Sequence, residues 1–283
     1  MQLHVIETGH FKLDGGAMFG VVPKLLWQRT HVADVHNLVS LTARCLLIAN
    51  ENRLILIDAG LGNKQSRKFF SHYHLFGSHR LETSIQQAGY SLDEITDVFL
   101  THLHFDHVGG ATSINHKSQI VPTFKKATYW VHQDQWNWAI NPNPREKASF
   151  LPENLHPLLE SQQLQFIQND AESLQRAKFP FDVLFFDGHT EKQMLPKITY
   201  KNNHIVFAGD LIPTYGHLPI PYIMGYDVRP LVTMKEKTIF LNSAVDQGFL
   251  LFMEHDIQHE LISLKQTPKG VRIDESMMLS ELF

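Results

Sequence analysis

The sequence predicts one α/β domain over residues 1–283, built as two packed β-sheets with helices on the outside. Three observations lead to this prediction. Apolar, β-branched runs of strand length recur in both halves of the chain, segments with helical spacing lie between them, and no internal repeat or low-complexity tract is evident. The hydrophobic content of 43% is ordinary for a globular protein, so a sizeable core is available.

Short strands are the first elements expected. Leu3–Ile6 and Phe11–Leu13 have strand character, and Asp14-Gly15-Gly16 predicts a turn after them. Residues 20–27 combine apolar side chains with Pro23, which a central strand does not tolerate. We therefore expect a partly ordered loop there. Met18, Phe19 and Trp27 could belong to the core or to a pocket wall, and residue type alone favours the core.

A β-hairpin is predicted next. Two apolar runs, Leu41–Ala49 and Leu54–Asp58, are separated by a short polar segment that is typical of a turn. Cys45, the single cysteine, lies in the first run and is expected in the core, and no intrachain disulfide can form. Asp58 ends the second run just before glycines, where it could cap a helix or orient a metal-bound histidine.

A cluster of metal-competent side chains follows the apolar run Ile95–Leu100, which we expect to be a buried strand. Three imidazoles and one carboxylate fall within six consecutive residues: His102, His104, Asp106 and His107. Gly109-Gly110 behind them predicts a tight turn. Imidazole and carboxylate together suit zinc, iron, manganese or cobalt. A solvated histidine-rich loop is the alternative, but chance rarely produces this cluster directly after a strand.

Three later apolar runs repeat this arrangement of a strand followed by a candidate ligand. Phe181–Asp187 precedes His189, and the two runs that start at His204 and Gly248 precede Asp210 and His255. Each residue alone would more often be a cap or a turn residue. Together with the cluster they supply seven ligands from four strand ends, about the number that two metals sharing a bridging carboxylate need.

Residues 133–160 are predicted to be an insertion of broken helices, since prolines and asparagines interrupt an aromatic-rich stretch. A lid or substrate wall and a plain surface excursion are equal alternatives. The aromatic residues of 133–152 also suggest an interface in a homodimer.

The charge balance argues against nucleic-acid and membrane partners. The net charge is −4 with 25 basic and 29 acidic residues, and no long like-charged block is present. Neither a secretory signal nor an apolar run of transmembrane length is visible, so a cytoplasmic protein is the expectation.

The ordered set of His102-x-His104-x-Asp106-His107, His189, Asp210 and His255 resembles the metallo-β-lactamase superfamily of hydrolases. The resemblance runs through essentially the whole chain and implies an αββα sandwich of two mixed β-sheets flanked by helices. It implies two divalent metal ions, with zinc preferred and iron, manganese or cobalt as alternatives. Asp58 falls where the family has an acid behind its metal ligands.

Carried onto this sequence, the resemblance implies that His102, His104 and His189 hold the first metal. Asp106, His107 and His255 would hold the second, with Asp210 bridging both. A hydroxide between the two metals would be the nucleophile, and the metals would polarise the substrate's carbonyl or phosphoryl oxygen. Asp106 could also exchange a proton with the leaving group.

Within the superfamily, the chain is most similar to lactonase-like hydrolases, including the quorum-quenching enzymes that open N-acyl homoserine lactones. The segment 14–24 resembles their N-terminal region, which implies that Met18 and Phe19 wall the substrate pocket. Those enzymes place a substrate-contacting tyrosine three residues after the bridging aspartate, and here Pro213 occupies that position. Tyr215 or His217 could supply the missing donor, although neither matches by position.

The leading hypothesis is a dinuclear hydrolase that opens a lactone or cleaves a small carboxylic ester, which is a small-molecule substrate in either case. The same metal pair also serves phosphodiester or organophosphate hydrolysis, which is the first alternative. An iron-dependent oxidoreductase is a second alternative, since the ligand set accepts iron. A metal-stabilised binding scaffold is the non-enzymatic one.

Overall fold

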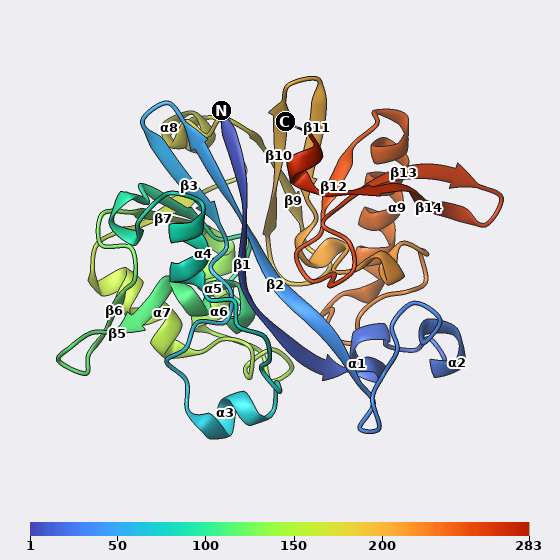
Figure 1. Cartoon of the computed structure of the whole chain (residues 1–283), viewed down its shortest axis with the longest axis horizontal. Coiled ribbons are helices and arrows are strands. Elements are labelled where there is room, and N and C mark those ends of the chain that lie inside the picture. The colour runs from blue at the N-terminus through green and yellow to red at the C-terminus, as the bar shows by residue number, and fades with distance from the viewer. Residues whose placement is uncertain (283) are drawn as a thin grey trace. The chain divides into compact units, whose positions relative to one another are not determined.

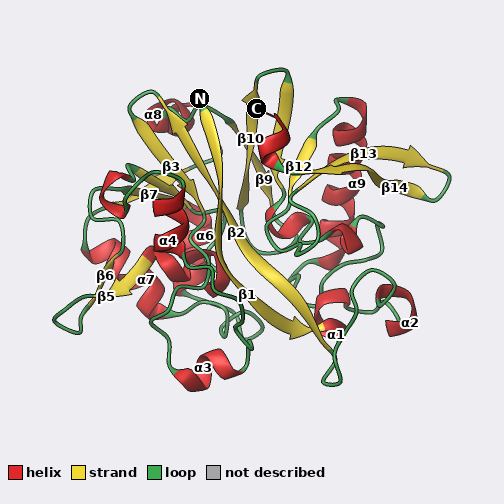
Figure 2. Ribbon diagram, in the orientation of Figure 1, coloured by secondary structure: helices red, strands yellow, loops and turns green. Residues whose placement is uncertain are grey.

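The computed structural model describes residues 1–282 and divides into two compact units, each discontinuous in sequence. Unit 1 comprises Met1–His10, Ala43–Pro180 and Lys192–Met194, and unit 2 comprises Phe11–Thr42, Phe181–Glu191 and the described residues from Leu195 onward. Each of the two main sheets contains six strands in mixed orientation, and helices flank them (Figures 1 and 2). The predicted mixed α/β class is therefore confirmed.

The first sheet has the strand order β1-β2-β3-β4-β7-β8. β2 pairs antiparallel with β3, whereas β3, β4, β7 and β8 run parallel. β4 is buried at every residue, as its apolar sequence predicts for a central parallel strand. The strands are β1 (Gln2–Asp14), β2 (Leu38–Asn50), β3 (Arg53–Ile57), β4 (Asp97–Phe99), β7 (Thr128–His132) and β8 (Leu164–Ile167).

Helices of unit 1 share one apolar core with this sheet. Ile85, Trp136 and Leu155, from three different helices, belong to the same buried cluster as Val98 and Tyr129 of the strands. The helices are α3 (Arg67–Ser71), α4 (Leu81–Gln87), α5 (Phe105–Val108), α6 (Gln133–Ile140), α7 (Pro152–Glu160) and α8 (Ala171–Ala177), with 3₁₀ turns η1 (Leu92–Glu94) and η2 (Gly109–Ala111) and a small hairpin of β5 (Thr112–Ile114) and β6 (Ile120–Pro122).

The second sheet has the order β14-β13-β12-β11-β10-β9. β11 and β12 are parallel, and β10–β11, β12–β13 and β13–β14 are antiparallel. The strands are β9 (Asp182–Phe186), β10 (Gln193–Tyr200), β11 (Asn203–Phe207), β12 (Leu250–Phe252), β13 (Leu261–Thr267) and β14 (Gly270–Met277).

One long helix, α9 (Pro230–Asp246), packs against this second sheet in unit 2. Its Phe240 and Leu241 share a buried cluster with Val206, Leu251 and Ile262 of three adjacent strands. The remaining elements of the unit are α1 (Gly15–Phe19), α2 (Lys24–Trp27) and the 3₁₀ turns η3 (Gly209–Leu211), η4 (Tyr215–His217) and η5 (Leu279–Leu282).

The predicted hairpin and the strands that precede the predicted ligands are confirmed, but the N-terminal region differs from its prediction. Leu3–Ile6 and Phe11–Leu13 belong to a single strand of 13 residues. The turn predicted at Asp14 is instead the start of α1, because the Asp14 side chain accepts a hydrogen bond of 2.8 Å from the amide of Ala17. Part of the loop predicted over residues 20–27 forms α2, with Pro23 just before its first turn.

Over residues 1–282, no helix has both the length and the apolar character needed to cross a bilayer.

Candidate functional site

Unit 1 carries four of the seven predicted ligands on the segment that follows β4. His102 and His104 lie on an irregular stretch, whereas Asp106 and His107 lie on the short helix α5. All four side chains are buried. We call residues 101–110 the ligand loop.

Glycine is needed at position 109 because the backbone packs closely there, and not for the tight turn that the sequence predicts. A Cβ on Gly109 would lie 2.1 Å from the carbonyl oxygen of Leu61. The loop therefore runs against the backbone of residues 59–61, to which it is joined by hydrogen bonds from Ala59 N to His107 O (2.7 Å) and from Gly110 N to Gly60 O (2.9 Å). Close approach, rather than a left-handed conformation, requires glycine here.

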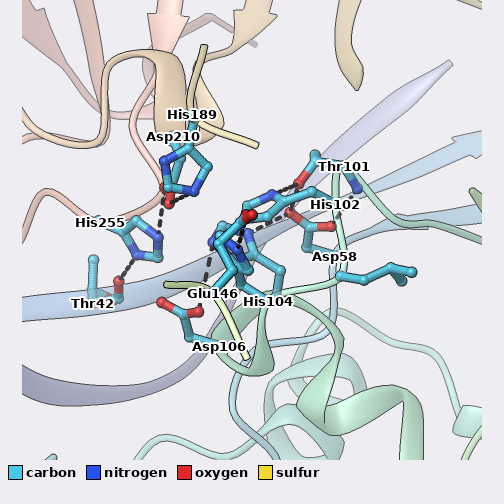
Figure 3. Close-up of polar contacts among 12 residues, drawn as sticks. Thr42, Asp58, Thr101, His102, His104, Asp106, Glu146, His189, Asp210 and His255 are labelled. Carbon is cyan, nitrogen blue, oxygen red and sulfur yellow. Dashed lines mark hydrogen bonds and ion pairs between the residues drawn. The ribbon is translucent and has the colours of Figure 1, made fainter. Parts of the chain in front are cut away.

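His102 and His104 direct one ring nitrogen toward each other. Nε2 of His102 lies 3.0 Å from Nδ1 of His104. The second nitrogen of each ring has its own partner, since His102 Nδ1 lies 3.1 Å from Thr101 Oγ1 and His104 Nε2 lies 3.3 Å from Glu146 Oε1. Figure 3 shows the Thr101 and Glu146 side chains beside these two rings.

Asp58 connects the first residue of the ligand loop to His107 of α5. Its carboxylate is fully buried and accepts hydrogen bonds from the amide (2.8 Å) and the hydroxyl (2.7 Å) of Thr101. The same carboxylate lies 3.0 Å from Nδ1 of His107. Of the two roles that the sequence left open for Asp58, the structure shows the contact with a predicted ligand histidine, and no helix begins directly after it.

Unit 2 carries the other three predicted ligands, with Asp210 between two imidazoles. Asp210 Oδ2 lies 3.0 Å from His189 Nε2, and Asp210 Oδ1 lies 3.0 Å from His255 Nε2 (Figure 3). The opposite nitrogens are also held. His189 Nδ1 lies 2.8 Å from Asp227 Oδ1, and His255 Nδ1 lies 2.9 Å from the carbonyl oxygen of Thr42.

His189 lies between two carboxylates. Burial by itself lowers the pKa of this imidazole, but Asp210 and Asp227 outweigh burial and raise the pKa to about 10. The surroundings of its ring therefore strongly favour positive charge. A divalent cation on Nε2 would satisfy the same demand, since it would place positive charge beside the carboxylate of Asp210.

The five histidines share one arrangement, and it fits a metal centre. In each ring one nitrogen faces another predicted ligand, and the other contacts a hydroxyl, a carboxylate or a backbone carbonyl. Histidines that bind metals typically have such a partner on the second nitrogen, because it fixes the tautomer and the orientation of the ring. The residues present therefore suit divalent metal ions that prefer nitrogen and oxygen ligands.

Tyr215 and His217 have partners inside unit 2. The Tyr215 hydroxyl donates to the carbonyl oxygen of Thr30 at 2.8 Å. His217 uses both ring nitrogens, with Nδ1 2.8 Å from Thr214 Oγ1 and Nε2 2.8 Å from the carbonyl oxygen of Met18. Burial lowers the pKa of His217 to about 3, so its ring is neutral at physiological pH.

Met18 and Phe19, the predicted pocket residues, are buried in unit 2 with 2% and 0% of their surface exposed. The ring of Phe19 stacks on the rings of His217 (4.5 Å between centroids) and Trp27 (5.1 Å). In this arrangement Phe19 connects α1, α2 and the turn that follows Asp210.

Sequence reasoning missed Thr42, Thr101, Glu146 and Asp227. Glu146 lies in the charged segment Pro144-Arg145-Glu146-Lys147, which resembles an ordinary surface loop, and Asp227 follows no strand. Thr42 acts through its backbone carbonyl, which every residue possesses. Only Thr101 had a local signal, its position at the start of the histidine cluster.

Comparison with known proteins places these residues in context. Residues 41–131, which include Asp58 and the ligand loop, match the model of the Metallo-beta-lactamase superfamily. No curated protein matches the chain at a significant level.

Several solved structures share the fold over nearly their whole length. A probable metal-dependent hydrolase from Staphylococcus aureus is 27% identical, with 98% of this chain and 96% of that chain covered and a TM-score of 0.87. The dizinc quorum-quenching lactonase AidC, solved with a product, is 21% identical, with 98% and 95% covered and a TM-score of 0.78. An N-acyl homoserine lactone hydrolase with N-hexanoyl-L-homoserine at its catalytic metal centre is 17% identical, with 90% and 93% covered and a TM-score of 0.67.

Proposed function

Because this chain carries a metallo-beta-lactamase superfamily domain and is a hydrolase of that superfamily, we propose that it opens a lactone or cleaves a small carboxylic ester with two divalent metal ions. An N-acyl homoserine lactone is the substrate that we propose to test first. This choice is supported by the resemblance of residues 14–24 to lactonases and by the two lactone-hydrolysing structures that share the fold.

The observation that carries the proposal is the position of Asp210 between His189 and His255. Each carboxylate oxygen contacts the Nε2 of a different imidazole at 3.0 Å. A carboxylate is suited to bridge two cations when each of its oxygens lies beside the nitrogen of a different imidazole ligand. The contacts of His189 and His255 with Asp227 and with the carbonyl of Thr42 hold both rings in that orientation.

We assign His102, His104 and His189 to one metal and Asp106, His107 and His255 to the other, with Asp210 shared. This division follows from the family resemblance and from the donor chemistry of the seven side chains. We propose zinc for both positions, since imidazole nitrogen and carboxylate oxygen are donors that suit it. When bound, such ions supply Lewis acidity toward the substrate carbonyl and make coordinated water acidic enough to ionise near neutral pH.

The chain's own residues would then orient the ions and move protons. Asp106 is the acid that we propose for proton exchange with the leaving group, because it is a carboxylate on the ligand loop and retains some exposure, at 9%. Tyr215 is the preferred donor to the substrate carbonyl. Its ring is partly exposed, and its hydroxyl would exchange the hydrogen bond to the carbonyl of Thr30 for one to the substrate. His217 is buried, and both of its ring nitrogens are bonded inside the protein.

A substrate panel tests the proposal. The protein, loaded with zinc and checked for two metal ions per chain by elemental analysis, is incubated with N-acyl homoserine lactones, aryl esters and aryl phosphodiesters. Ring opening of a lactone or cleavage of an ester is expected, and Asp210→Asn should abolish it. Turnover of phosphodiesters alone would replace the lactonase proposal by the phosphoesterase alternative. In the protein as purified, before zinc loading, a single iron per chain with oxygen consumption would indicate an oxidoreductase.

Four expectations from the sequence stay predictions. They are that Met18 and Phe19 form a substrate wall, that residues 133–160 form a lid or wall, that residues 1–283 form one domain, and that the protein is a homodimer. The Phe19→Ala variant should change the acyl-chain preference if Phe19 shapes the pocket. Sedimentation analysis measures the oligomeric state directly.

A further inference from the structure

Residues 133–160 hold the ligand loop by its backbone. The amide of Leu103 donates to Oε1 of Gln135 at 3.3 Å, and the amide of Phe105 donates to the carbonyl oxygen of Ser149 at 2.9 Å. Gln135 is completely buried. The insertion therefore fixes the backbone on both sides of His104.

The same insertion also holds the His104 side chain. Glu146, which is 2% exposed, places Oε1 3.3 Å from His104 Nε2. The ring of Phe150 lies 4.9 Å from the ring of His104, measured between centroids. The carboxylate of Glu146 thus contacts one nitrogen of the imidazole, and the ring of Phe150 packs against the imidazole ring.

The other oxygen of Glu146 is held by two donors of the insertion itself. Oε2 accepts hydrogen bonds of 2.6 Å from the indole N–H of Trp138 and of 2.6 Å from the side-chain amide of Asn143. These two bonds leave Oε1 directed at His104. Figure 3 shows Glu146 beside the His104 ring.

We propose that Glu146 is a positioning residue of the metal centre: its carboxylate fixes the tautomer of His104 and thereby makes Nδ1 the ligand atom. This inference rests on the proposed metal-dependent function. A carboxylate only accepts hydrogen bonds, so the nitrogen that contacts it carries the hydrogen. His104 is then protonated on Nε2, and its Nδ1 lone pair points toward His102 Nε2, 3.0 Å away.

Glutamine at position 146 separates this role from simple packing, because it has the same shape but one oxygen and one NH₂ group. Trp138 and Asn143 both donate, so the amide oxygen should turn to them and the NH₂ group should face His104. The NH₂ group would donate to His104 Nε2 and favour the tautomer protonated on Nδ1. That tautomer has no lone pair on Nδ1 for a metal.

The experiment compares zinc affinity, thermal stability and the His104 tautomer in the wild type, Glu146→Gln and Glu146→Ala. Glu160→Gln, an exposed glutamate of the same insertion, is the matched control. We expect zinc affinity to fall about 10- to 100-fold in both Glu146 variants and to stay unchanged in the control. Nitrogen NMR of histidine-labelled, metal-free protein should show His104 protonated on Nε2 in the wild type and on Nδ1 in Glu146→Gln.

Three results would overturn the inference. They are wild-type His104 protonated on Nδ1, zinc affinity of Glu146→Gln within threefold of the wild type, and a tautomer that does not change in that variant. The wild-type spectrum decides the question even if a variant does not fold. A wild type that binds no metal would instead remove the proposed function, so the two failures are distinguishable.

Discussion

Asp227 accepts a hydrogen bond of 2.8 Å from Nδ1 of His189, across 38 residues of sequence. The backbone holds this pair in place, because Val228 N donates to His189 O (3.1 Å) and Arg229 N donates to Gly188 O (2.9 Å). The segment that carries Asp227 is therefore attached to the segment that carries His189. This contact leaves Nε2 of His189 for Asp210 and, in the proposed function, for a metal ion.

Replacement of Asp227 should weaken metal binding. Asp227→Ala removes the acceptor for His189 Nδ1 and should lower zinc affinity about 10- to 100-fold. Asp227→Asn keeps an acceptor oxygen and should lose less. Competition with a chromophoric chelator measures both affinities, and the exposed Asp246→Asn is the control. Equal affinities in the wild type and Asp227→Ala would show that His189 needs no such partner.

Thr101 should matter through its hydroxyl alone. The hydroxyl donates to Asp58 Oδ2 at 2.7 Å and lies 3.1 Å from His102 Nδ1, so it connects the carboxylate of Asp58 to one predicted ligand. Asp58 in turn contacts a second predicted ligand, His107. Thr101→Val keeps the shape but leaves buried polar atoms unsatisfied, which should cost about 1–3 kcal/mol of stability. Zinc affinity should fall as well.

Thr101→Ser is the matched rescue variant, since it restores the hydroxyl and removes only a methyl group. Urea unfolding gives the stability and chelator competition gives the affinity. A valine variant that matches the wild type in both measurements would contradict this role for Thr101.

The local part of the site could be predicted from sequence, and the long-range part could not. His102, His104, Asp106 and His107 are adjacent in the chain, and His189, Asp210 and His255 each follow an apolar strand that confines its position. Glu146 lies 42 residues from His104, and Asp227 lies 38 residues from His189. Both are on irregular segments, where no periodic pattern indicates which way a side chain points.

Most of the fold could also be predicted, because apolar strands confine the chain. The prediction was wrong where the same residues are compatible with two conformations. Asp14-Gly15-Gly16 suits a turn and also suits a helix start, and the hydrogen bond from Ala17 N to Asp14 decides for the helix. Gly9 interrupts the apolar pattern of β1, although the strand continues through it with φ of 139°. Pairing with the neighbouring strand overrides the local signal there.

His217 should make the protein sensitive to acid. Burial is the main reason that its pKa falls from the usual 6.5 to about 3, and His31 and Lys237 lower the pKa further. The backbone carbonyl of Met18 and the carboxylate of Asp210 oppose this shift. Below pH 6.5 the unfolded chain binds a proton that the folded chain does not, so stability falls as pH falls from about 6.5 toward 3. Between pH 7.5 and 5.5 the loss from this residue should be about 1 kcal/mol.

The comparison of wild type with His217→Gln isolates this effect. Urea unfolding of the metal-free proteins at both pH values should show a smaller acid-induced loss in the variant, whatever its stability at pH 7.5. His72→Gln, which changes an exposed histidine, should keep the wild-type loss. An identical pH dependence in wild type and His217→Gln would show that the buried ring accepts a proton as readily as an exposed one.

Gly109→Ala should disturb the ligand loop by steric contact alone. The new Cβ would meet the carbonyl oxygen and carbon of Leu61 at 2.1 and 2.5 Å, and these are backbone atoms that cannot rotate away. The loop would have to separate from residues 59–61 and lose the bond from Ala59 N to His107 O. We expect the free energy of unfolding, measured in urea, to fall by about 1–3 kcal/mol, together with weaker zinc binding.

Gly89→Ala is the control, because its φ of 92° strains any side chain while no atom lies within 4 Å of the added Cβ. That variant should lose stability but keep its zinc affinity, and a Gly109→Ala protein with unchanged zinc affinity would show that the ligand loop does not depend on this contact.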